Sequence, residues 1–149
     1  MIIFQITLFF FDFFMYVLLE KWVVCAMLAY FICMQVRKTS LSFSLECFYL
    51  PVFLILIQDF FVNGVWGLSF LYLVPIVLLV PKIKNVFKVH NALLITVLLF
   101  FALIIQDFII KRWIIGQNIG IYSTITKIFI NILVGYLVLL GVRSSRSFT

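Results

Sequence analysis

Apolar residues occur along the chain in long runs that short polar segments separate. We interpret each run as an α-helix, although several are shorter than the ~20 residues of an upright membrane span. The second run is the weakest, and it could be shortened or fused to the first as one bent helix, so five helices is an alternative to six. The runs cover residues 2–19, 22–36, 43–60, 66–81, 90–110 and 121–141.

Composition places these helices in a membrane. Hydrophobic residues make up 66% of the chain and charged residues only 11%, whereas soluble domains average about 25% charged. A water-soluble fold of 149 residues could not hide that much apolar surface. We therefore predict an all-α, polytopic membrane bundle that forms a single domain over residues 1–149. The net charge is +6, and the basic residues lie between the apolar runs. This placement favours a role in membrane topology and in contact with anionic lipid over binding of nucleic acid.

The segment between the third and fourth runs organises the chain. We predict a helix ending near Asp59, a tight turn through Asn63 and Gly64, and a second helix starting near Trp66. Gly64 and Gly67 supply the positive-φ positions that a sharp reversal needs. Asp59 should lie at a membrane face or accept hydrogen bonds from the turn, because a carboxylate in an apolar helix is costly. The hairpin is our candidate for contact with a partner.

Asp12 lies inside the first run, among phenylalanines. If that helix spans a membrane, the Asp12 side chain must face protein, pair with a polar group or be protonated. Gln35, Asn131 or a helix of another protein could supply the partner. The sequence does not choose among these three.

A four-residue segment, Ile-Gln-Asp-Phe, occurs at residues 57–60 and again at 105–108. Each copy closes an apolar run, and a tryptophan and a glycine follow it. Duplication and convergence on a common helix end both explain the echo. In either case we expect Asp59 and Asp107 to lie at the same depth, and Asp59→Leu to disturb assembly more than Asp107→Leu.

Lysine and arginine predict the orientation. With six helices and a cytoplasmic N-terminus, seven basic residues lie inside and four outside. This bias favours both termini in the cytoplasm. The inside set is Arg37, Lys38, Lys82, Lys84, Lys88, Arg143 and Arg146, and the outside set is Lys21, Lys111, Arg112 and Lys127.

The last run carries small and polar residues at four-residue intervals, which places them on one helix face. Such a face permits close approach and interhelical hydrogen bonds. We expect it to contact other helices of this chain, with a partner protein as the alternative. The residues are Ser123, Lys127, Asn131 and Gly135.

The sequence contains none of the HExxH, P-loop, Rossmann or GxSxG motifs. The single histidine, His90, ends a basic loop, and Cys25, Cys33 and Cys47 lack metal-type spacing. We interpret the cysteines as packing thiols. We expect no enzymatic activity, no cofactor and no metal.

The order of these features resembles the rod-shape-determining protein MreD family, whose members have about this length and five or six membrane helices. The most recognisable segment of that family is an apolar helix ending in Asp, a short turn of small residues, and Gly-Leu at the next helix. Bulky Phe48, Tyr49 and Pro51 stand where the family commonly has glycine. The matching residues are 56–60, Asn63-Gly64, Gly67-Leu68, the basic loop 82–88, Asp107 and the tail from Arg143 to Arg146.

The resemblance implies a non-enzymatic scaffold of the bacterial cell-elongation machinery in the inner membrane. Such proteins bind the single-span protein MreC and help link MreB filaments to peptidoglycan synthases. The fold is also similar to the substrate-binding components of energy-coupling-factor vitamin transporters. A transporter subunit is therefore the alternative, motivated by Pro51, Pro75 and Asp12, although it would need a polar-lined pocket.

Overall fold

The computed structural model describes the chain in five segments, and all the regular secondary structure within them is helical. The predicted all-α class is confirmed to that extent. The described segments are residues 2–19, 24–37, 44–87, 91–118 and 120–144. Lys21, Lys38, Lys88, His90 and Arg146, which the sequence analysis names, lie outside these segments.

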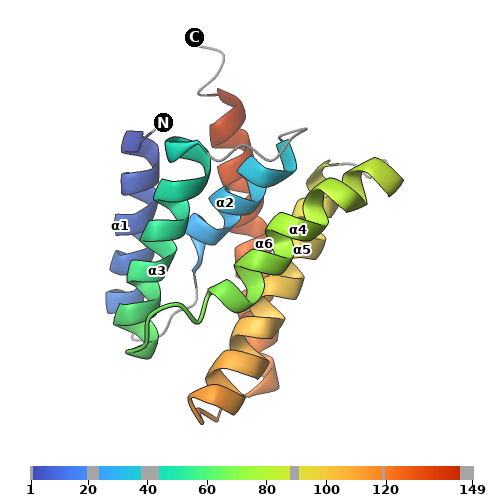
Figure 1. Ribbon diagram of the computed structural model, residues 1–149. Coiled ribbons are helices and arrows are strands. Elements are labelled where there is room, and N and C mark those ends of the chain that lie inside the picture. The colour runs from blue at the N-terminus through green and yellow to red at the C-terminus, as the bar shows by residue number, and fades with distance from the viewer. Residues whose placement is uncertain (1, 20–23, 38–43, 88–90, 119, 145–149) are drawn as a thin grey trace.

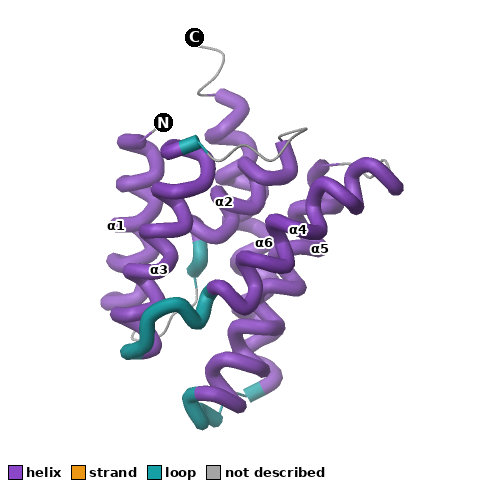
Figure 2. The backbone as a smooth tube through the Cα atoms, in the orientation of Figure 1, coloured by secondary structure: helices purple, strands orange, loops and turns teal. Residues whose placement is uncertain are grey.

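Six α-helices follow one another, so the second apolar run forms a helix of its own (Figure 1). A π-helical segment, η1, leads into the third helix, and a second one, η2, continues the fifth. Figure 2 shows the turn that joins α3 to α4. The elements are α1 (Ile2–Leu19), α2 (Ala26–Arg37), η1 (Leu45–Tyr49), α3 (Leu50–Asn63), α4 (Phe70–Phe87), α5 (Asn91–Ile104), η2 (Ile105–Ile114) and α6 (Ile121–Ser144).

The short helix α2 lies at the centre of the bundle, where it contacts all five other helices (Figure 1). Every residue from 26 to 36 is buried. A helix that is buried on all sides must be apolar all round, which removes the amphipathic pattern of a surface helix. Its 12 residues give a length of ~18 Å, about half of a ~30 Å hydrocarbon layer. The second run is therefore short because α2 begins inside the bundle.

The outer surface of the bundle is apolar. Among the described residues, three helices are long and apolar enough to cross a membrane: Ile2–Leu19, Asn91–Ile114 and Ile121–Val142. On α1 the buried side chains are the polar Gln5 and Asp12, while large apolar side chains such as Phe10 are exposed. This arrangement is the reverse of a water-soluble helix.

The predicted hairpin is present, with both helix ends displaced. α3 continues to Asn63, one turn beyond Asp59, and α4 begins at Phe70, four residues after the predicted start near Trp66. The intervening turn has φ of 69° at Gly64 and 87° at Gly67, as the glycines predicted. The helix ends are displaced because Asp59 is buried inside α3 and accepts a hydrogen bond from Ser69, at the end of the turn. The turn therefore lies beyond Asp59.

The prolines occupy different helix positions. Pro51 lies at the junction where η1 passes into α3, and because proline has no N–H it cannot form the backbone hydrogen bond of a continuous helix there. Pro75 and Pro81 lie inside α4. The segment directly before α3 is the π-helical segment η1.

Replacing Gly64 with alanine should lower the free energy of unfolding by about 1–2 kcal/mol, because an L-residue is strained in the left-handed region. An added Cβ meets no atom within 4 Å, so backbone strain alone is tested. Gly120→Ala, which also has open space but an ordinary φ, is the matched control and should be nearly neutral. Thermal unfolding in detergent micelles makes the comparison. Equal stability of the two variants would contradict the turn.

Candidate functional site

The carboxylate of Asp12 caps the N-terminus of α2. Its Oδ1 accepts a hydrogen bond from the Ala26 N–H at 2.7 Å, and its Oδ2 accepts one from the Met27 N–H at 2.9 Å. Gln58 Nε2 donates to the same Oδ2 at 3.3 Å. The first N–H groups of a helix lack intrahelical partners and carry partial positive charge. Asp12, which is completely buried, therefore supplies from α1 the cap that α2 lacks in its own sequence.

The partners of Asp12 are not the side chains that the sequence suggested. Asn131 instead accepts a hydrogen bond at Oδ1 from the Cys25 N–H at 2.7 Å, directly before α2. Gln35 lies toward the other end of α2 and donates to the Cys47 carbonyl at 3.3 Å. The partners expected from the sequence were side chains, whereas the main donors to Asp12 are the backbone N–H groups at the start of α2.

The C-terminus of α2 is capped by the opposite charge. Lys84 of α4 donates from Nζ to the Val36 carbonyl oxygen. A cation is favourable at a helix C-terminus, as an anion is at the N-terminus. Side chains from α1 and α4 therefore hold both ends of α2.

Asp59 holds the start of α4 in a similar way. Its Oδ2 accepts a hydrogen bond from the Ser69 N–H at 2.7 Å, and its Oδ1 accepts one from the Ser69 hydroxyl at 2.6 Å. The Ser69 hydroxyl also lies within hydrogen-bond distance of the Tyr72 hydroxyl. The expectation that Asp59 bonds to N–H groups of its own turn agrees with this geometry. Asn63 is the last residue of α3, and it lines the cavity described below.

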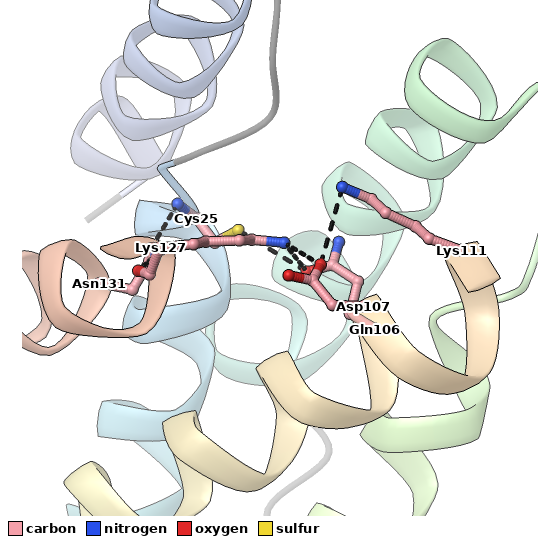
Figure 3. Close-up of polar contacts among 6 residues, drawn as sticks. All are labelled: Cys25, Gln106, Asp107, Lys111, Lys127 and Asn131. Atoms are coloured by element: carbon pink, nitrogen blue, oxygen red, sulfur yellow. Dashed lines mark hydrogen bonds and ion pairs between the residues drawn. The ribbon is translucent and has the colours of Figure 1, made fainter. Parts of the chain in front are cut away.

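The second Gln-Asp pair forms an ion pair with α6. Lys127 crosses from α6 to η2, where Nζ lies 2.8 Å from Asp107 Oδ1 and donates to Gln106 Oε1 at 2.9 Å (Figure 3). Lys111 lies 3.7 Å from the same Asp107 oxygen. Both Lys127 and Asp107 are buried, so each compensates a charge that would otherwise be very costly.

The two copies of the Ile-Gln-Asp-Phe segment meet beside the start of α2. Gln58, Asp59 and Gln106 line one cavity together with Cys25. Its volume is about 10 Å³, close to the ~10–15 Å³ that a single water needs. The aspartates have different roles, because Asp59 bonds to an uncharged serine and Asp107 to a lysine.

The polar face of α6 lies mostly against this chain. Lys127 and Asn131 are buried, and Ser123 is exposed. Gly135 lets α5 approach closely, since a Cβ at that position would lie 2.7 Å from Leu99 Cδ1. The intramolecular interpretation therefore holds for Lys127, Asn131 and Gly135.

Sequence reasoning missed the role of Lys127 by counting it as an outside residue for topology. Its side chain is directed into the bundle (Figure 3). The four-residue spacing from Lys127 to Asn131 was the available signal, because it placed both on one face. Ser69 carried no signal, since its role depends on the position of Asp59 across the turn.

Most of the buried polar residues form one layer around the start of α2, which we call the polar layer, whereas Gln35 lies toward the other end of α2. It joins elements through hydrogen bonds and ion pairs, and it offers no group of three or more His, Cys, Asp or Glu residues for a metal within the described part of the chain. Its members are Asp12, Cys25, Gln58, Asp59, Ser69, Tyr72, Gln106, Asp107, Lys111, Lys127 and Asn131.

No family model, curated protein or solved structure matches this chain.

Asp12→Leu should lower stability strongly, because it leaves two buried N–H groups of α2 unbonded at roughly 1–3 kcal/mol each. Asp12→Asn keeps one acceptor oxygen and should cost less. Phe10→Leu, at an exposed position of the same helix, is the control. Thermal unfolding in detergent should rank Asp12→Leu below Asp12→Asn and Asp12→Asn below Phe10→Leu; any other order argues against the cap.

Asp107→Leu should destabilise the protein by about 3–5 kcal/mol, because it leaves the buried Lys127 ammonium uncompensated. The double variant Asp107→Leu/Lys127→Leu should recover most of that loss, since an apolar pair can replace a buried ion pair. Asp59→Leu removes bonds to neutral donors and should cost about 1–3 kcal/mol. We therefore expect the larger loss of stability at Asp107, whereas the expectation that Asp59→Leu disturbs assembly more stays a prediction. Failure of the double variant to recover stability would contradict the ion pair.

Proposed function

We propose that this chain is an integral membrane protein of six helices that acts as a non-enzymatic scaffold for a partner's membrane helix. The observation that carries the proposal is the segregation of polar and apolar groups. Buried hydrogen bonds and ion pairs connect the residues of the polar layer inside the bundle. Large apolar side chains cover the outer surface of the bundle. Lipid is the solvent that suits such a surface.

The arrangement of the chain supports an orientation with both termini in the cytoplasm. The first residues of α1 and the last of α6 lie at the same end of the bundle (Figure 1). The C-terminal ends of α2 and α4, where Arg37 and Lys84 lie, are at this side of the bundle as well. Lys127 lies within α6 and is buried in the bundle, so it does not belong to an outside loop. The positive-inside bias, which counts basic residues in loops, therefore becomes stronger.

An apolar cleft between α3 and α4 is the surface that we assign to the partner helix. It has a volume of about 140 Å³, close to the ~150 Å³ of a cavity that admits benzene. Its floor is Phe31 of the buried α2, and its walls include Val52 of α3 and Val74 of α4. One large apolar side chain of a neighbouring helix fits this space, and helix packing in lipid depends on such contacts.

The identity of the partner follows from the resemblance to the MreD family. We infer a single-span MreC-type protein as the partner, and through it MreB filaments and peptidoglycan synthases, in the bacterial inner membrane. The vitamin-transporter alternative has less support. The polar cavity beside Asp59 measures about 10 Å³, whereas small-molecule pockets measure ~300–1,000 Å³.

Val74→Trp should fill the cleft and weaken co-purification with an MreC-type partner roughly tenfold, as loss of a buried anchor contact does. Val97→Trp is the matched control, because Val97 on α5 is exposed to 51% and Val74 to 48%. The measurement is recovery of the co-expressed partner from mild detergent. No association of the wild-type chain would count against the scaffold, and equal recovery with both variants would count against the cleft.

A further inference from the structure

The outer end of the polar layer carries more positive than negative charge. The Asp107 carboxylate lies 2.8 Å from the Lys127 ammonium and 3.7 Å from the Lys111 ammonium. Arg112, the next residue, is exposed and makes no ion pair with any described residue. This end of the described chain therefore carries one carboxylate and three cations, of which Lys127 and Lys111 lie near the carboxylate.

The other described carboxylates are already bonded elsewhere. Asp12 accepts hydrogen bonds from α2, and Asp59 accepts them from Ser69. Lys111 itself is only 12% exposed, and its distance to Asp107 exceeds that of a hydrogen bond. A cation that is largely removed from water and shares its counter-ion gains from a second anion.

Aromatic residues place this end at a membrane surface. Trp113, beside Arg112, is 83% exposed, and Tyr122, at the start of α6, is 88% exposed. Trp66, in the turn between α3 and α4, is exposed as well. Tryptophan and tyrosine gather at the level of the lipid headgroups. The unbalanced cations of η2 therefore lie where lipid phosphates lie.

We propose that Lys111 and Arg112 bind the phosphate of an anionic phospholipid at this end of the bundle. The Arg112 guanidinium supplies a planar set of donors that matches phosphate oxygens, and the Lys111 ammonium supplies a second charge. The Asp107 carboxylate lies closer to Lys127 than to Lys111, so it compensates the Lys111 ammonium only in part. The acyl chains lie along the exposed apolar side chains of η2 and α6. This inference rests on the membrane location proposed above, and it does not depend on the partner.

The test titrates the detergent-purified full chain with short-chain phosphatidylglycerol, phosphatidylcholine or inorganic phosphate and follows thermal unfolding. A ligand that binds only the folded state raises the unfolding temperature. Phosphatidylglycerol should stabilise the protein, and the other two should have little effect. Lys111→Gln/Arg112→Gln should weaken the apparent affinity for phosphatidylglycerol roughly thirtyfold, at about 1 kcal/mol for each cation.

Lys82→Gln is the control, because Lys82 is exposed near the opposite end of the bundle; it should leave the affinity unchanged. Arg112→Gln alone retains the ion pairs of Asp107 and should still lose about fivefold, which separates lipid binding from misfolding. Equal stabilisation by phosphatidylcholine, or by inorganic phosphate, would overturn the proposal. So would a double variant that binds phosphatidylglycerol normally but fails to recover the partner, since the cations would then contact protein.

Discussion

The bundle depends on the capping of a helix that begins inside it. α2 is buried on every side, and its first N–H groups point into a region with little access to water. Each unbonded N–H there would cost several kcal/mol in hydrocarbon. The Asp12 carboxylate accepts hydrogen bonds from two of them, and Asn131 accepts one from the preceding N–H, that of Cys25. Lys84 donates to a carbonyl at the other end of the helix. Because α2 contacts all the other helices, these bonds fix its height in the bundle and thereby the packing of its neighbours.

The polar layer gives position where apolar packing alone gives little. Lipid and side chains are equally apolar, so a membrane helix can slide against another at small cost unless specific contacts hold it. Gln58, Asp59 and Ser69 tie α3 to α1 and α4, and the Lys127–Asp107 pair ties α6 to η2. Each bond is satisfied in only one register of the helices. The function that we propose, presentation of a cleft and a cationic end to membrane neighbours, requires surfaces held in fixed positions.

The two outer surfaces with proposed roles lie in different parts of the fold. The cleft lies where α3 and α4 diverge over Phe31, and the cations lie at the end of η2. One offers shape to an apolar side chain, and the other offers charge to a phosphate. Their separation lets a partner helix and a lipid occupy the protein together. The cavity between the Gln-Asp pairs is small and belongs to the framework that supports both surfaces.

The sequence by itself determined the helical class, the apolar exterior and the turn at Gly64 and Gly67, because hydrophobic run lengths and positive-φ glycines are local properties. It also indicated that Asp12 and Asp59 needed partners, since a buried carboxylate is costly in any apolar setting. For Asp59 it named the N–H groups of the neighbouring turn. Only the tertiary structure decided the partners of Asp12, because a sequence does not show which helix end packs against a given side chain. The central position of α2 and the pairing of Lys127 with Asp107 depended on the same contacts between distant segments. Patterns along the chain report what each residue needs, whereas packing in three dimensions decides what meets that need.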